Sequence, residues 1–181
     1  GCCVIWKRST ACHVTPIDSS NRRLCGVKIC TGTETIMLAT VYMPCDTLHD
    51  QTNLNEFTEI LNEMSSLALA HDADHLICCG DFNTDFSRNL SLHTRALNDF
   101  LEQESLCNLQ SMPMYDVDFT YESFIDGSRS IIDHVFVSEN LMTQVESVSV
   151  IHSLDNLSDH APLICELKLA NMYATQSRES R

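Results

Sequence analysis

Alternation of apolar and polar residues predicts that the chain opens with β-strands. These runs are rich in β-branched residues, which suit a pleated, half-buried surface. Thr31-Gly32-Thr33 separates two of them and predicts a hairpin turn. The predicted strands are residues 2–7, a short strand through His13 and Val14, residues 24–30 and residues 34–42.

The apolar period then changes to that of a helix. Asn53, with Glu56 three residues later, matches a capping pair at a helix N-terminus. A second helix is predicted over residues 92–104, with Ser91 as its cap. The apolar positions of the first helix share one face; they are Leu54, Phe57, Ile60, Leu61, Met64, Leu67 and Ala68.

Residues 75–79 form a short run that is apolar on both faces, which is typical of a central buried strand. After the second helix the chain again has the pattern of strands. Two helices among about eight strands predict helices packed outside a pair of sheets. These later strands are expected around Phe119 and at residues 130–138, 144–151 and 162–169.

The length of 181 residues and the 44% of hydrophobic residues predict one globular domain, residues 1–170, followed by a polar tail, residues 171–181, expected to be disordered. No apolar run is long enough to cross a membrane, and the opening residues lack the order of a signal peptide. Because the sequence does not begin with Met and its first residues have the pattern of a strand interior, we expect it to be part of a longer polypeptide.

Ten cysteines leave disulfides, a zinc site or reduced thiols as alternatives. Cys30, Cys78, Cys79 and Cys165 lie inside apolar, strand-like runs, which favours buried thiols in a reducing compartment, nuclear or cytoplasmic. No Cys-x-x-Cys pair has the histidine spacing of a zinc site. The net charge of −14 opposes phosphate binding, unless the acidity is concentrated in a metal site and on a distant surface.

Polar groups stand at the ends of four apolar runs. Tyr42-Met43-Pro44 closes one strand, and Gly80-Asp81-Phe82-Asn83 closes the buried one. Asp133 interrupts the apolar residues 131–137, and Ser158-Asp159-His160 precedes the last strand. Alternation sends Asp81 and Asn83 to one side of their strand. Because a buried carboxylate needs a partner, these ends are candidates for a site.

Each of these motifs also has a structural interpretation. Tyr42, which precedes Pro44 by two residues, is also consistent with an aromatic side chain at the rim of the sheet. Asp81 and Asn83 are also consistent with an Asx turn, in which their side chains cap the backbone. The Ser158-Asp159-His160 segment fits a simple turn. His134 faces the side opposite Asp133, which favours a structural role.

Taken in this order, the four motifs resemble those of the endonuclease/exonuclease/phosphatase superfamily, above all the endonucleases of non-LTR retrotransposons and their apurinic-endonuclease relatives. The resemblance covers nearly all of the chain, and VYMP, GDFN, IDHVFVS and SDHAPL carry it. It implies an α/β fold, a four-layer α/β/β/α sandwich of the deoxyribonuclease I type, here lacking its first strands.

The resemblance also implies roles in phosphodiester hydrolysis. Asp81 matches a general base or a water-orienting carboxylate. Asn83 matches a group that hydrogen-bonds the phosphate, and Tyr42 matches a tyrosine that donates to the phosphate or assists the leaving oxygen. Asp133 matches the carboxylate that holds His160 as a charged donor to a phosphate oxygen. Asp81, Asn83 and Asp159 match ligands of a divalent cation, Mg²⁺ or Mn²⁺, which prefers oxygen donors.

One departure from the family is important. Family members carry an Asn and a metal-binding Glu on strands that have no counterpart here, and Glu34 and Glu56 are misplaced as substitutes. We therefore expect the chain alone to bind metal poorly and to cleave weakly or not at all. The missing strands should also leave an unpaired edge that favours aggregation.

Three functions follow as hypotheses. The first is a metal-dependent DNA endonuclease that nicks target DNA, as a monomeric domain within a retrotransposon polyprotein, with Arg22, Arg23 and Arg129 as DNA contacts or solvated turn residues. The second is a phosphatase of the same fold acting on an inositol phosphate or lipid headgroup, although the Pro-x-Trp-Cys-Asp-Arg motif of that branch is absent. The third is a decayed, non-catalytic fragment.

Overall fold

A six-stranded mixed sheet forms the centre of the computed structural model, which describes residues 1–7, 13–47, 50–153 and 155–169. Its strands follow the order β1-β2-β3-β4-β8-β5. The pairing is antiparallel except between β3 and β4, which run parallel. The strands are β1 (His13–Ile17), β2 (Leu24–Cys30), β3 (Thr35–Tyr42), β4 (His75–Asp81), β8 (Asp133–Ser138) and β5 (Leu106–Asn108).

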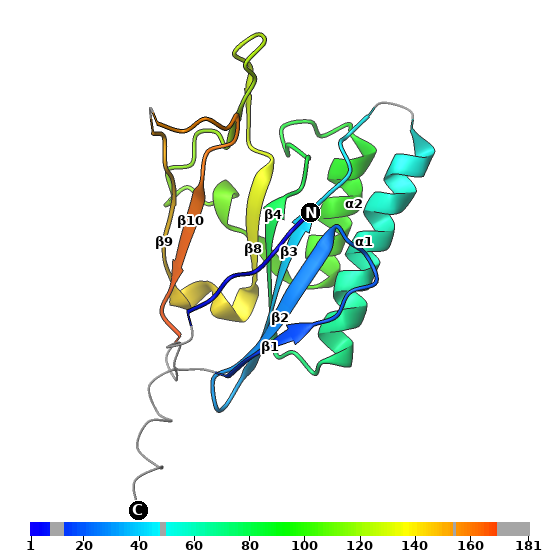
Figure 1. Cartoon of the computed structure of the whole chain (residues 1–181), viewed down its shortest axis with the longest axis vertical. Coiled ribbons are helices and arrows are strands. Elements are labelled where there is room, and N and C mark those ends of the chain that lie inside the picture. The colour runs from blue at the N-terminus through cyan, green and yellow to red at the C-terminus, as the bar shows by residue number, and fades with distance from the viewer. Residues whose placement is uncertain (8–12, 48–49, 154, 170–181) are drawn as a thin grey trace, which may run out of the picture.

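Two helices, α1 (Gln51–Ala70) and α2 (Leu92–Gln103), cover one face of this sheet (Figure 1). The predicted stripe of α1 is buried at Phe57, Ile60, Leu61 and Met64. The Ser91 side chain caps α2, as predicted, by accepting from the amides of the second and third helical residues.

The predicted cap of α1 is wrong. Asp50 caps the helix instead, because its carboxylate accepts hydrogen bonds from the Thr52 and Asn53 amides. Asn53 lies inside the first turn, where its Oδ1 is 2.9 Å from Nε2 of His93 on α2. The capping motif therefore begins three residues earlier than predicted.

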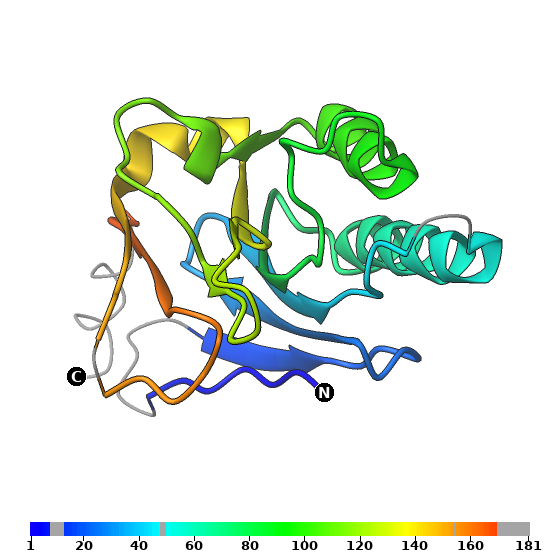
Figure 2. The same ribbon diagram turned by 90° about the horizontal axis from the view of Figure 1, so that it is seen from above.

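A second, two-stranded antiparallel sheet packs against the other face of the central sheet. It consists of β9 (Val145–Val150) and β10 (Leu163–Leu167). Val148, Leu163 and Cys165 pack with Ile77 and Val135 into a second apolar core. Figure 2 shows the helices, the central sheet and β9–β10 as successive layers. The predicted α/β sandwich is thus confirmed, although no α-helix covers the outer face of β9–β10 within the described residues.

Short elements complete the fold. The 3₁₀ helices η1 (Leu109–Ser111) and η2 (Glu139–Gln144) flank β5 and β9, and β6 (Tyr121–Glu122) pairs with β7 (Arg129–Ser130) as a small hairpin. Residues 1–7 are not a strand, contrary to prediction, and they lie beside the β1–β2 hairpin (Figure 2). Among the described strands the outer edge of β1 stays unpaired, so residues 1–7 do not extend the central sheet.

Several other predictions were tested by the described residues. Nine of the ten cysteines are described, and all nine are free thiols, as predicted. No helix among the described residues is long and apolar enough to cross a bilayer. The predicted tail, residues 171–181, lies outside the described residues.

Candidate active site

Sheet pairing brings three of the four polar strand ends together. Tyr42 at the end of β3 is the register partner of Asp81 at the end of β4. Asp81 is in turn the partner of Asp133 at the start of β8. Because β8 runs antiparallel to β4, its first residue meets the last residue of β4 at one edge of the sheet. Two carboxylates therefore face each other at this edge.

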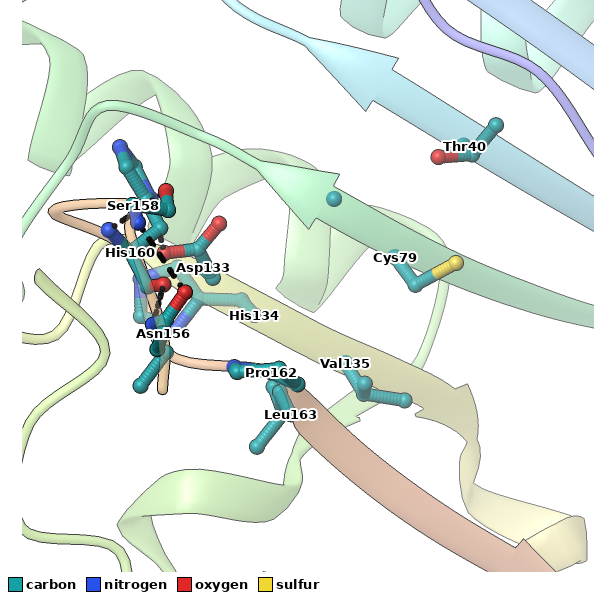
Figure 3. A pocket seen from close by; sticks show the side chains of 12 residues that line it. Thr40, Cys79, Asp133, His134, Val135, Asn156, Ser158, His160, Pro162 and Leu163 are labelled. Atoms are coloured by element: carbon teal, nitrogen blue, oxygen red, sulfur yellow. Dashed lines mark hydrogen bonds and ion pairs between the residues drawn. The ribbon is translucent and has the colours of Figure 1, made fainter. Parts of the chain in front are cut away.

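The fourth segment reaches the same edge through the loop before β10. His160 forms an isolated antiparallel bridge with Tyr121 of the small hairpin, and the Tyr121 ring packs edge-on to the imidazole. The imidazole Nδ1 donates to Oδ2 of Asp133 at 2.8 Å (Figure 3). Its Nε2 lies 4.0 Å from Oδ2 of Asp81, beyond hydrogen-bond distance. The two carboxylates thus lie on either side of one histidine.

The backbone after β4 turns sharply to present Asn83. Asn83 has a positive φ of 49°, and its amide N–H donates to Oδ1 of Asp81 at 2.8 Å. The Asn83 side-chain nitrogen donates to the Met43 carbonyl at 2.9 Å and contacts Asp81 Oδ2 at 3.3 Å. Phe82 points the other way and is fully buried. Asp81 and Asn83 therefore form the Asx turn and belong to the polar site at the same time.

Burial has the largest influence on Asp81 and raises its pKa from 3.8 to about 6. The Asn83 hydrogen bond lowers this pKa, the charge of Asp133 raises it, His160 lowers it and Asp159 raises it. A carboxylate with a pKa near 6 is ionised at neutral pH, yet accepts a proton more readily than an exposed carboxylate. This behaviour suits a general base.

The surroundings of His160 favour its protonated, charged form. Burial alone lowers its pKa, but the hydrogen bond to Asp133 and the negative charges of Asp133, Asp81 and Asp159 outweigh burial, so that the pKa is raised. An imidazole in this setting keeps its proton closer to neutral pH and donates from Nε2.

Three residues that the sequence analysis did not single out support the pair of Asp133 and His160. Thr120 is fully buried, and its Oγ1 accepts from the amides of Ile132 and Asp133, both at 3.0 Å. The Asn156 side-chain amide donates to the His160 carbonyl at 2.7 Å. Tyr121 packs on the imidazole, as described above. Thr120 and Asn156 act through backbone groups, which leave no pattern in the sequence.

A cavity of about 460 Å³ extends from this cluster between the two sheets. Asp133, His160 and Asn156 stand at its polar end, whereas Val135 and Leu163 line its apolar end (Figure 3). The cavity places the cluster at an opening that a ligand can reach.

Two of the three predicted cation ligands, Asp81 and Asn83, are hydrogen-bonded to each other, and the third, Asp159, is near enough for its charge to raise the pKa of Asp81. Asp159 borders a recess with Arg129 on one side of His160, whereas Asn83 borders a different recess. Within the described part of the chain, no group of three or more histidine, cysteine, aspartate or glutamate side chains is arranged to hold a metal ion. The hydrogen-bonded pair of Asp81 and Asn83 is therefore the part of the predicted ligand set that the described residues bring into contact.

The three predicted DNA-contact arginines have different surroundings. Arg22 is exposed in the β1–β2 turn. Arg23 is engaged: its Nε pairs with Glu56 at 2.8 Å, and its guanidinium lies 5.3 Å from the centre of the Tyr42 ring. Arg129 pairs with Glu122 at 3.3 Å and covers the ring of Phe119 beside the Asp159 recess.

Comparison with known proteins identifies a family and a fold. A family model described as endonuclease-reverse transcriptase matches residues 36–164, a span that includes all four polar strand ends. No curated protein matches the sequence.

Solved structures share the fold. The endonuclease domain of TRAS1, a telomere-specific non-LTR retrotransposon, superposes with a TM-score of 0.71 at 18% identity, covering 90% of this chain and 72% of that one. The 3′ phosphatase NExo from Neisseria, bound to a product DNA hairpin, gives 0.67 at 16% identity over 86% of this chain and 70% of that one. An AP endonuclease from Archaeoglobus fulgidus gives 0.64 at 15% identity, with 88% and 80% covered. At such identities the likeness shows the fold alone.

Proposed function

Because the chain belongs to the endonuclease-reverse transcriptase family of the endonuclease/exonuclease/phosphatase superfamily, we propose that it hydrolyses phosphodiester bonds of DNA as the endonuclease part of a retrotransposon polyprotein. Family and fold indicate a nuclease or phosphodiesterase. The choice of DNA is supported by the relatives, of which one is a retrotransposon endonuclease domain and another is bound to a DNA hairpin.

One observation carries the proposal: Asp81 and Asp133 lie on either side of His160 at one edge of the sheet. Hydrolysis of a phosphodiester requires a group that takes a proton from the attacking water and a donor that stabilises the charged phosphate oxygens. Asp81, with its pKa raised to about 6, suits the first task. His160, oriented through Nδ1 by Asp133, suits the second because its Nε2 has no hydrogen-bond partner within the described residues.

Tyr42 and Asn83 complete the phosphate-facing rim. Tyr42 is 43% exposed and is the register partner of Asp81, so the residue is accessible to a phosphate bound there. Arg23 restrains Tyr42, because its Nη1 donates to the Tyr42 carbonyl at 3.2 Å while Glu56 holds its Nε. Arg23 therefore supports the site from behind, and Arg129 and Arg22 are the better candidates for direct DNA contact.

The cation remains a prediction. Mg²⁺ and Mn²⁺ would neutralise the charge that develops on the phosphate, and they bind oxygen ligands. Asp81, Asn83 and Asp159 are the donors that the resemblance implies, but they do not form a closed set within the described residues. We therefore expect full activity only where the parent polypeptide supplies a further oxygen donor.

Nicking of supercoiled plasmid tests the proposal. The parent polypeptide should nick plasmid with Mg²⁺ or Mn²⁺ and not with EDTA, and the 181-residue chain should be much weaker. Asp81→Ala and His160→Ala in the parent should each lower the rate by about 10²-fold or more, because each removes a group that handles a proton. Cys79→Ala, a neighbouring change without a proposed role, should leave the rate unchanged.

Two results would count against the proposal. Undiminished nicking by both active-site variants would remove the assigned roles. An inactive parent polypeptide that folds normally would favour the decayed, non-catalytic alternative.

A further inference from the structure

A recess of about 240 Å³ is lined in part by His160 and does not include Asp159. Asn83, Tyr121, Ser130 and His160 contribute to its lining, and Arg88 borders it from the loop after β4. His160 is the only residue that this recess shares with the recess of Asp159 and Arg129. The candidate active site is therefore bordered by two separate recesses, each with an arginine.

Arg88 differs from Arg23 and Arg129 in having no carboxylate partner. Among the residues that the structure describes, no aspartate or glutamate lies within ion-pair distance of its guanidinium. The side chain is exposed, so its charge is available to a ligand.

The only carboxylate among the described residues of the recess is already engaged. Oδ1 of Asp46 lies 3.1 Å from Nδ1 of the buried His93, and the Asp46 side chain is only 12% exposed. The Asp46 carboxylate is therefore largely buried and is paired with His93. The remaining lining offers an available cation and neutral polar groups, which is the chemistry that binds a phosphate.

We propose that this recess binds the phosphate next to the scissile one on the same nucleic-acid strand, with Arg88 as its cationic contact. The inference rests on the proposed function, and it adds a second phosphate subsite to it. Because Arg129 borders the other recess that His160 lines, the strand would cross the cluster between two arginines. Such contacts position the backbone without reading its sequence.

Salt-dependent binding tests this subsite without requiring catalysis. Binding of a fluorescein-labelled DNA duplex to the full chain in EDTA is followed by anisotropy over a series of NaCl concentrations. Arg88→Ala should weaken binding and reduce the slope of log K against log [NaCl] by about 0.9, the value expected for one lost phosphate contact. Arg95→Ala is the matched control, because Arg95 is exposed on α2 and its loss makes the same change in charge without altering the recess.

A single neutral methylphosphonate makes the test position-specific. Placed beside the scissile phosphate, it should weaken binding of the unaltered chain and leave binding by Arg88→Ala almost unchanged, since the contact is already lost. Circular dichroism would establish that the variants are folded.

The outcomes separate the two proposals. If the unaltered chain shows no salt-dependent DNA binding, this inference fails, whereas the proposed function is decided separately by plasmid nicking with the parent polypeptide. If the chain binds but Arg88→Ala behaves like Arg95→Ala, or responds fully to the methylphosphonate, the subsite is overturned and the proposed function stands.

Discussion

At the scale of single residues, His134 shows how alternation separates two neighbouring polar groups. Asp133 points to the open edge of the sheet, whereas His134 points into the core beneath the helices, where it is 1% exposed. Its Nε2 donates to the Thr84 carbonyl at 2.8 Å, and its ring packs among Phe82, Phe86 and Phe136. His134 therefore supports the loop that carries Asn83.

Burial lowers the pKa of His134 from 6.5 to about 4, which makes stability depend on pH. The folded protein holds the neutral imidazole, whereas the unfolded chain binds a proton below about pH 6.5. This contribution to stability is complete above pH 6.5 and is lost as the pH falls toward 4. Urea unfolding at about pH 7.5 and about pH 5 should show a loss of about 2 kcal/mol from this residue.

His134→Gln provides the comparison, because glutamine keeps an N–H donor and does not titrate. The variant should be less stable than the unaltered chain near neutral pH, yet its stability should fall less on acidification. Equal losses in the two proteins would show that His134 is not held neutral.

Part of this residue-level organisation can be predicted from the sequence. Alternation places Asp81 and Asn83 on one side, and it separates Asp133 from His134. The contact of Asp133 with His160 depends on where a distant loop returns, which local pattern does not specify. Arg23 was interpreted as a DNA contact or a solvated turn residue, because its partner Glu56 is 33 residues away in sequence.

At the scale of elements, the site depends on a close approach of two parallel strands. Gly80 of β4 lies in register with Val41 of β3 and has a φ of +129°. A Cβ at this position would lie 2.2 Å from the Val41 carbonyl oxygen and 2.9 Å from its nitrogen. Glycine therefore lets the two strand ends meet and sets Tyr42 opposite Asp81.

Gly80→Ala should destabilise the protein by about 3 kcal/mol or more, because backbone strain and a steric clash add together. Gly127→Ala is the control: Gly127 also has a positive φ, +69°, but a Cβ at that position would have no described atom within 4 Å. Its cost should be about 1 kcal/mol, from the backbone conformation alone. Chemical denaturation measures both values, and equal costs would contradict the role of the close approach.

Helices and strands with a clear hydrophobic periodicity were predicted well, whereas those that depend on pairing with distant residues were not. The strand at residues 24–30 matches β2, and the apolar stripe of α1 is buried as expected. Residues 2–7 have the pattern of a strand, but a strand also requires backbone pairing, and this segment pairs with none of the described strands although the outer edge of β1 is open. The N-terminus of α1 was misplaced because Asp50 and Asn53 both suit a cap, and only the geometry selects Asp50.

At the scale of the whole molecule, an open sheet edge favours self-association, whereas the net charge opposes it. Within the described strands β10 pairs only with β9, and Ile164 on β10 is 39% exposed. An unpaired edge with an exposed apolar residue is a template for a second strand. The net charge of −14 opposes association, but salt screens it over about 10 Å at 0.1 M.

The chain should therefore self-associate more as salt is raised, with β10 pairing to β10 of a second copy. Sedimentation velocity should show a mass that grows with protein concentration and with NaCl. Ile164→Lys places a charge at the edge and should keep the chain monomeric. Ile125→Lys makes the same substitution at a hairpin residue that is 97% exposed, and it should leave association unchanged. If Ile125→Lys abolished association and Ile164→Lys did not, the contact would lie at the hairpin, and the edge of β10 would remain unused.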